Sequence, residues 1–154
     1  PLQRELDILC LYMDLEKMRH SHDFSYTIET DDQIDPAITM VPPLILQPFV
    51  ENSIKHGFVQ DDKAYHIWIR LQADGETLHC RITDNGIGFS AKKEQISVSG
   101  FKKESLGLKL TEDRLRLINQ VTRSESAWSI RDFNDENNTT GTLVSLQLPY
   151  ILAA

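Results

Sequence analysis

Two short segments constrain this chain more than any other feature of its sequence. The first, Gln47 to Gly57, has the apolar spacing of an amphipathic helix. The second, Asp84 to Gly88, is a glycine-containing turn at the end of a run in which apolar residues alternate. Because helices repeat at three to four residues and half-buried strands at two, the pair requires a domain that combines helices with strands.

The same periodicities divide the rest of the chain into elements. They predict helices over residues 2 to about 20, from the Pro42-Pro43 pair to Gly57, and around 108–118. They predict strands over 24–28, 66–71, 78–82, 128–133 and 143–148. Asp74-Gly75 between two of these strands is typical of a hairpin turn. Pro48 has to lie in the first turn of its helix or kink it there.

Composition narrows the class of protein. With 154 residues, of which 40% are hydrophobic, the chain is long enough for one domain with its own core. A net charge of −7, from 16 basic and 23 acidic residues, argues against a general nucleic-acid binder. Cys10 and Cys80 lie in apolar patterns without metal-type spacing, so we expect buried free thiols. No apolar run reaches the ~18–20 residues of a membrane span. The chain begins at Pro1 and reads as a piece of a longer protein.

The helix over 47–57 should pack its apolar arc, which includes Ser53, on a sheet. Its opposite arc carries an acid, an amide and two basic groups: Glu51, Asn52, Lys55 and His56. An ordinary solvated face is one interpretation of this arc. Asparagine, however, is a poor helix former. The amide oxygen of Asn52 is a suitable ligand for Mg²⁺, and Lys55 is suited to phosphate oxygens, so a metal–phosphate site is the other interpretation.

The turn from Asp84 to Gly88 also has two interpretations. Asp, Asn and Gly are the favoured residues of a simple acidic turn. Alternatively, Gly86 and Gly88 permit a ligand to approach the backbone, and the Asp84 carboxylate accepts a hydrogen bond from an exocyclic amine. The segment matches neither the dinucleotide fingerprint nor the P-loop. Together with the helix over 47–57, it suggests a nucleotide site.

A second glycine element lies at the start of the helix expected around 108–118. Gly107 and Leu108 follow a mostly polar stretch over 89–105, which we interpret as a long mobile loop. Helix N-termini present unpaired N–H groups and a positive dipole end, which suits phosphate. A glycine that merely precedes a helix is the alternative. Thr142, after Gly141, opens the last strand.

These motifs, read in order, resemble the ATP-binding domain of sensor histidine kinases. Leu44 to Gly57 resembles the asparagine box of that family, Asp84 to Phe89 and Ser105 to Asn119 its two glycine boxes, and Gly141-Thr142 its terminal element. Residues 44–57, with the opening segment 2–19, are similar to the LytS/YehU-like subgroup. The resemblance implies a two-layer α/β sandwich, a mixed sheet with helices on one face, as in gyrase-type and Hsp90-type ATPases. It divides the chain into a linker helix, 1–22, and a catalytic domain, 23–154.

The resemblance implies ATP and Mg²⁺ as cofactors. Asn52 would bind the metal, and Asp84 would accept from the adenine amino group. Gly86 and Gly88 would shape the adenine pocket, and Thr142 would lie close to the base.

The phosphate end of the nucleotide is implied in the same way. Lys55, His56, Gly107 and Leu108 would lie near the phosphates, with Glu51 and Lys55 as the catalytic residues. The segment 89–105 corresponds to the ATP lid of the family.

The sequence departs from the family pattern at three places. Ser105 stands where the second glycine box usually opens with Gly. ATP-hydrolysing relatives have a Glu one helical turn before the Asn, and Pro48 stands at that position here. The nearest acid in this chain is Glu51, directly before Asn52. His20 and His22 lie in no phosphoacceptor motif, so we expect the acceptor histidine outside this chain.

By this resemblance the chain transfers the γ-phosphoryl group of ATP to a histidine, from which a response regulator takes it. The partners implied are the protein's own dimerisation domain and that regulator, in a membrane-anchored homodimer whose ATP-binding domain is cytoplasmic. Two alternatives remain open: a gyrase- or Hsp90-type ATPase domain, and a non-catalytic nucleotide-sensing or dimerisation module.

Overall fold

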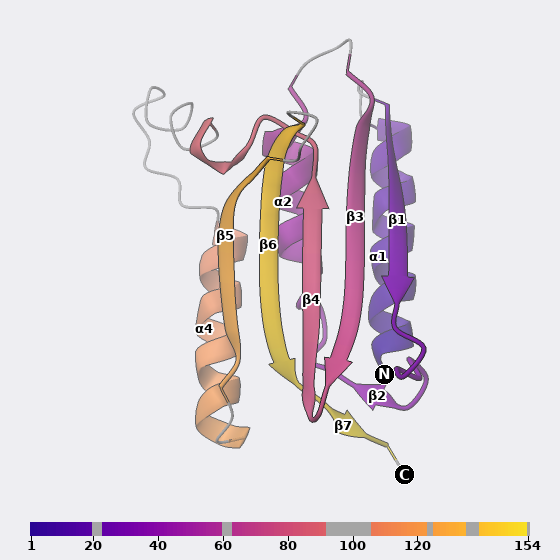
Figure 1. Ribbon diagram of the computed structural model, residues 1–154, viewed down its shortest axis with the longest axis vertical. Helices are drawn as coiled ribbons and strands as arrows, with labels where there is room; N and C mark the ends of the chain where they lie inside the picture. Colours follow the sequence, from indigo (N-terminus) through magenta and orange to yellow (C-terminus); the bar gives the residue numbers. More distant parts are fainter. Residues whose placement is uncertain (20–22, 60–62, 92–105, 123–124, 135–138, 154) are drawn as a thin grey trace.

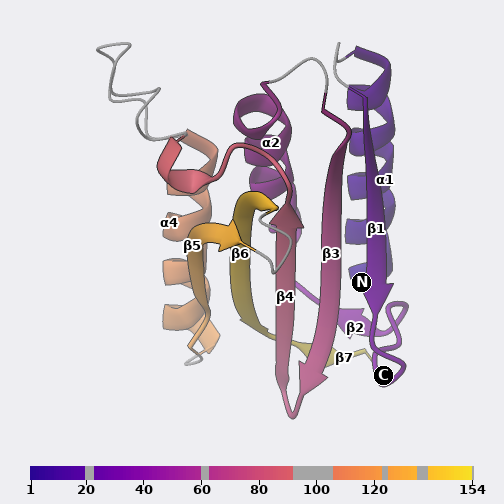
Figure 2. The ribbon, with the colours of Figure 1, turned by 45° about the horizontal axis from the view of Figure 1, so that its top comes forward.

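The chain folds into a helical layer on one face of a β-sheet. The computed structural model describes residues 1–19, 23–59, 63–91, 106–122, 125–134 and 139–153. Within these ranges, helices α1 (Leu2–Arg19), α2 (Gln47–Gly57) and α4 (Leu106–Thr122) lie side by side on the same face of the sheet (Figures 1 and 2). The predicted two-layer α/β architecture is confirmed.

The large sheet is mixed, as predicted. Its strands are β1 (Phe24–Thr30), β3 (Tyr65–Asp74), β4 (Thr77–Asp84), β5 (Ala127–Asn134) and β6 (Thr140–Pro149). They are ordered β1-β3-β4-β6-β5. Strand β1 is parallel to β3, and the remaining three neighbouring pairs are antiparallel. Two short strands that the periodicity did not predict, β2 (Thr39–Met40) and β7 (Ile151–Leu152), pair antiparallel beside it.

The strand alternation explains which face of the sheet is covered. Along β3, Tyr65, Ile67, Ile69 and Leu71 are buried, while the residues between them are half-buried or exposed. A period of two places these buried side chains on one face. The β3–β4 hairpin turns at Gly75, between the paired residues Asp74 and Thr77. The hairpin predicted from Asp-Gly is therefore confirmed.

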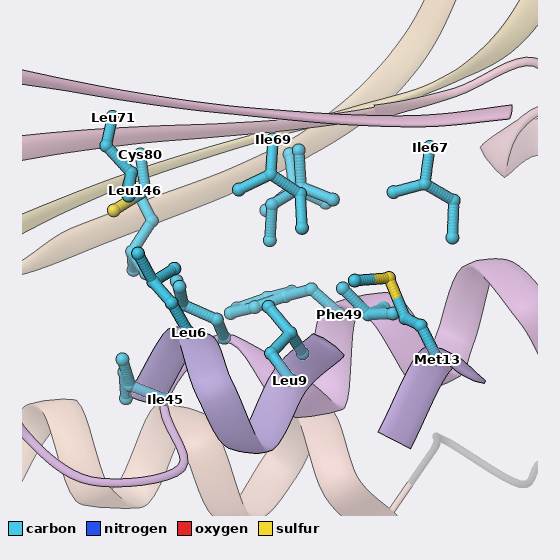
Figure 3. Close-up of a cluster of buried hydrophobic side chains, with 14 of the residues drawn as sticks. Leu6, Leu9, Met13, Ile45, Phe49, Ile67, Ile69, Leu71, Cys80 and Leu146 are labelled. Carbon is cyan, nitrogen blue, oxygen red and sulfur yellow. The ribbon is translucent and has the colours of Figure 1, made fainter. Parts of the chain in front are cut away.

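The core lies between the helices and the sheet (Figure 3). Its helical side is formed by apolar side chains of α1 and α2: Leu9, Met13 and Phe49 lie opposite Ile67 and Ile69 of β3, and Leu6 lies opposite Cys80 and Leu146. Full burial of such a side chain contributes about 1.5–3 kcal/mol. Helix α1 is thus part of the core, and the predicted domain boundary after residue 22 stays a prediction.

Several local predictions can be compared with the structure. Pro48 lies in the first turn of α2, as one of its two predicted placements required. Cys80 is a buried free thiol, whereas Cys10 is only half-buried. Residues 89–91 form a helical turn, and the remainder of the predicted lid, 92–105, lies outside the described residues, as do His20 and His22. Among the described residues, no helix has the length and apolarity to cross a bilayer.

Candidate functional site

The two faces of α2 divide as its sequence predicts. Phe49, Val50, Ser53 and Ile54 are buried, whereas Lys55 and His56 are exposed and Glu51 and Asn52 are half-buried. Helix α2 therefore presents its amide and basic groups away from the core.

The Glu51 carboxylate is bound by its own helix. Its Oε2 forms an ion pair with Lys55 Nζ at 3.0 Å, and its Oε1 accepts a hydrogen bond from Gln47 Nε2 at 2.9 Å. Lys55 and Glu51 are one turn apart, where such pairs form readily. The catalytic roles predicted for both residues stay predictions, and each residue is oriented by the other.

Asp84, the last residue of β4, is held by three separate elements. Its Oδ2 accepts a hydrogen bond from Ser53 Oγ of α2 at 2.5 Å. Its Oδ1 accepts from the backbone N–H of Gly86 at 2.9 Å and of Thr142, on β6, at 3.2 Å. The side chain is 1% exposed. A buried carboxylate with three donors has a fixed orientation, which is what recognition of a single amine requires.

The glycine turn after Asp84 packs on the end of α2. A Cβ at Gly86 would lie 2.6 Å from the carbonyl oxygen of Gly57, and Ile87 N donates to that same carbonyl at 3.1 Å. Gly88 has φ of +89°, which favours glycine. The structure therefore places Gly86 beside Asp84, whereas Gly88 lies beside Asp132 and Gly141. It also gives Gly86 a reason that the sequence did not reveal, namely close contact with the backbone of α2.

Thr142 and its neighbour Gly141 complete the strand side of this site. Thr142 is buried and pairs with Asp84 across the β4–β6 ladder. A Cβ at Gly141 would lie 1.7 Å from the carbonyl oxygen of Asp84, so a larger residue would push the two strands apart. Gly141 thus allows β6 to approach the backbone of Asp84, and Thr142 pairs with that residue.

The predicted phosphate element lies at the start of α4. Gly107 is the second residue of that helix, and a Cβ there would lie 3.7 Å from Pro48 Cβ of α2, an ordinary contact distance. Gly107 therefore lies beside the first turn of α2. Leu108 is half-buried and packs against the hydrophobic core.

Two polar contacts at the site were not predicted from the sequence. Ser53 had been assigned to the apolar arc, yet it holds Asp84; a hydroxyl on a buried face signals a partner, since buried polar groups are hydrogen-bonded. Asp132 on β5 accepts from Ser90 N at 3.0 Å and from Ser90 Oγ, so it ties the turn after Gly88 to the sheet. No local pattern marks Asp132, because its partner is distant in sequence.

The polar face of α2 offers one amide that could serve as a metal ligand, Asn52. Among the described residues, no group of three or more His, Cys, Asp or Glu side chains could hold an ion. Mg²⁺ commonly takes one or two protein ligands and completes its shell with phosphates and water. Asn52, half-buried on the polar face of α2, is a suitable single ligand of this kind.

Comparison with known families identifies one matching model. Residues 43–151 match the family described as histidine kinase-, DNA gyrase B- and HSP90-like ATPase. The matched range includes α2, the glycine turn, α4 and β6.

Curated relatives resemble nearly the whole chain. It is 31% identical over 149 residues to the sensor protein LytS of Staphylococcus epidermidis, covering 97% of this chain and 24% of the relative. It is 29% identical over 153 residues to the sensor protein LytS of Streptococcus mutans, covering 97% of this chain and 24% of that relative. The chain thus spans about a quarter of the length of these relatives.

Solved structures share the fold at low sequence identity. The mycobacterial sensor histidine kinase MprB has a TM-score of 0.59 at 16% identity, with 96% of this chain and 95% of that chain covered. The catalytic domain of histidine kinase ThkA has a TM-score of 0.55 at 18% identity, with 96% of this chain and 92% of that chain covered.

Proposed function

Because the chain belongs to the family of histidine kinase-, DNA gyrase B- and HSP90-like ATPases, we propose that it is the ATP-binding catalytic domain of a sensor histidine kinase. The observation that carries this proposal is the buried Asp84, held by Ser53 of α2, Gly86 of its own turn and Thr142 of β6. This carboxylate is suited to the adenine amino group. The similarity to sensor proteins over most of the chain supports the kinase rather than the other members of the family.

The side chains on α2 have complementary roles in this proposal. Asn52 would hold Mg²⁺, which would supply positive charge to stabilise the phosphates of the nucleotide. Lys55 lies one turn further along and orients the phosphates by its charge, with Glu51 fixing the position of its ammonium group. His56 and the start of α4 at Gly107 and Leu108 border the same region. Catalysis by this chain then consists of positioning and charge neutralisation.

The destination of the phosphoryl group lies outside this chain in our proposal. The acceptor is a histidine on a dimerisation domain of the same protein, and an aspartate of a response regulator takes the group next. The intact protein is a membrane-anchored homodimer with this domain in the cytoplasm. Support comes from the relatives named as sensor proteins, of which the chain spans about a quarter.

Radiolabelled ATP separates the three possible activities. We would incubate [γ-³²P]ATP and Mg²⁺ with the full-length protein and analyse the label at alkaline pH, where phosphohistidine survives. Protein-bound, acid-labile phosphate is the expected result. Release of free phosphate without labelled protein would indicate a gyrase- or Hsp90-type ATPase. Binding without turnover would indicate a nucleotide-sensing module.

Pro48 favours the kinase over the hydrolytic alternative. It occupies the first turn of α2, one turn before Asn52, and its ring has no group that could activate water. Proline is compatible with this position, because the N–H that it lacks would have no partner within the first turn of a helix. The neighbouring acid, Glu51, is engaged by Lys55 and Gln47.

A further inference from the structure

Glu5 of α1 is a buried carboxylate that binds the chain just before α2. Its side chain is 5% exposed. Its Oε2 accepts a hydrogen bond from Leu44 N at 2.6 Å, and its Oε1 accepts from Ile45 N at 2.8 Å and from Leu46 N at 3.0 Å. One side chain on α1 thus satisfies three successive backbone donors some 40 residues away in the sequence.

These contacts lie immediately before α2 (Gln47–Gly57), and the last of the three donors, Leu46 N, belongs to the N-cap of that helix. No side chain at its N-cap, Leu46, accepts a hydrogen bond, and its first turn carries no acidic residue. A helix start leaves backbone N–H groups unpaired and has a positive dipole end. The Glu5 carboxylate provides both acceptors and a compensating negative charge at that place.

The same short segment is also held from α4. Arg114 Nη1 donates to the carbonyl oxygen of Leu44 at 3.2 Å, and Arg114 Nη2 donates to that of Pro43. Leu44 has φ of +54°, a conformation that a leucine adopts only when its surroundings impose it. The segment Pro43 to Leu46 is therefore fixed by a carboxylate on one side and a guanidinium on the other.

We propose that Glu5 is a positioning residue of the nucleotide site, acting through α2. By fixing where α2 begins, it sets where Asn52 lies relative to the Asp84 carboxylate, which accepts a hydrogen bond from the adjacent Ser53 Oγ at 2.5 Å. The inference rests on the proposed function, since it assigns Asn52 to the metal. A displacement of about 1 Å in such a constellation costs up to about 100-fold in activity.

The substitution Glu5→Gln tests this role with little change in volume. One oxygen can still accept from Ile45 and Leu46, but the new amide group then faces the N–H of Leu44, and two donors oppose each other. Asp7→Asn is the matched control, because it removes the same charge from the same helix. Asp7 is exposed, and its carboxylate accepts from Gln3 Nε2 at 2.8 Å on α1 itself.

The first measurement is nucleotide affinity by titration calorimetry, for the 154-residue chain, with Mg²⁺ and with EDTA. In Glu5→Gln we expect the Mg²⁺-dependent gain in ATP affinity to fall by about 5- to 100-fold. The affinity in EDTA, which depends on Asp84, should stay within about threefold of wild type. Asp7→Asn should behave as wild type in both. An unchanged Mg²⁺ dependence in folded Glu5→Gln would overturn the proposal.

The second measurement needs no nucleotide, so it separates failure of this inference from failure of the proposed function. In the ligand-free chain, the NMR signals of the Asn52 side-chain amide should shift in Glu5→Gln but not in Asp7→Asn. Backbone amides of 50–54 should also exchange faster. If wild type bound no nucleotide, the proposed function would fail, and these signals would still decide the role of Glu5. Unchanged Asn52 signals would overturn the proposal, because Glu5 would then bind the segment before α2 without affecting the position of Asn52.

A shorter carboxylate guards against misfolding of the amide variant. Glu5→Asp keeps the charge but withdraws it by one methylene, so it cannot reach all three amides. We expect the same changes as in Glu5→Gln in the Asn52 signals and in the Mg²⁺ dependence. Wild-type values of both in folded Glu5→Asp would overturn the proposal.

Discussion

Ser53 Oγ donates a 2.5 Å hydrogen bond to Asp84 Oδ2, and both side chains are buried. This bond joins α2, which carries the proposed metal ligand, to the end of β4, which carries the proposed adenine ligand. It links the two halves of the site directly, as does the hydrogen bond from Ile87 N to the carbonyl oxygen of Gly57 at the end of α2. Its loss should therefore affect stability and nucleotide binding together.

Ser53→Ala should destabilise the domain by about 1.5–3 kcal/mol, because a buried carboxylate loses a donor. The helix itself should tolerate the change, since alanine is the better helix former. Urea unfolding measures the effect. Ser129→Ala, at an exposed position of β5, is the control and should change stability by less than about 0.5 kcal/mol. Equal stability of Ser53→Ala and wild type would show that this bond contributes nothing.

Asp84→Asn should weaken ATP binding by about 1.5–3 kcal/mol, or roughly 10- to 100-fold. The amide oxygen can still accept from Gly86 and Thr142, so the fold should persist. GTP, which has a carbonyl where ATP has the amino group, should bind poorly to wild type. Titration calorimetry with both nucleotides checks this, and equal affinity for ATP and GTP would contradict the assignment of Asp84.

Asn52→Ala should abolish most of the coupling between nucleotide and Mg²⁺. In wild type, each ligand should strengthen binding of the other, because the phosphates complete the metal shell. The variant loses one metal ligand while the contacts of Asp84 remain. Its stability should change little, since Asn52 lies half-buried on the polar face of α2. If the variant unfolds, Asn52 is structural. If the Mg²⁺ dependence is unchanged, the metal ligand is another residue, with Glu51 the next candidate.

Two glycine-to-alanine substitutions should differ in their effect on stability, because only one of the two glycines lies against backbone. Gly141→Ala places a methyl group 1.7 Å from the Asp84 carbonyl oxygen and should cost about 3 kcal/mol or more. Gly107→Ala meets only Pro48 at 3.7 Å, and should be neutral or stabilising by up to about 1 kcal/mol. Thermal unfolding compares the two. If Gly107 borders phosphate, its variant should nevertheless bind ATP more weakly, and unchanged affinity would remove Gly107 from the site.

His66, on the sheet face away from the helices, should make stability depend on pH. Its ring nitrogens form hydrogen bonds with Ser25 Oγ at 2.6 Å and Thr27 Oγ1 at 2.9 Å. Burial lowers the pKa of His66 below its usual value of about 6.5. The unfolded chain therefore binds more protons than the folded chain near pH 6, and stability should fall as the pH drops below about 6.5. Urea unfolding between pH 5 and 7.5 measures this. His66→Gln should show a shallower dependence, and identical curves would refute it.

Much of the fold followed from local patterns. The positions of Phe49, Val50 and Ile54 in a helical period predicted the buried face of α2, and their burial confirms it. The strand runs and the Asp-Gly turn predicted the β3–β4 hairpin, because turn chemistry and alternation are properties of neighbouring residues. The resemblance to a family assigned Asp84 and Thr142 to one nucleotide site; the structure pairs them across the β4–β6 ladder, and the site itself stays a prediction.

The contacts that fix the site depended on pairs that sequence spacing does not encode. The role of Gly86 in the adenine pocket stays a prediction, and the structure adds a packing reason for glycine there, since a Cβ would lie 2.6 Å from the Gly57 carbonyl oxygen. Glu5, in the predicted linker helix, binds the backbone just before α2, a contact that no sequence spacing indicates. Asp132 was not singled out at all, although it binds Ser90 across 42 positions.

The sequence by itself determined the longer helices and strands, which of their faces are apolar, and the order of the motifs along the chain. These depend on residues a few positions apart, so periodicity and turn preferences reveal them. The tertiary structure decided which groups meet. Asp84 joins Ser53 across 31 positions and Thr142 across 58, and Glu5 joins Leu46 across 41. Such pairs form only when the helical layer packs on the sheet, because packing brings together donors and acceptors that no local spacing relates.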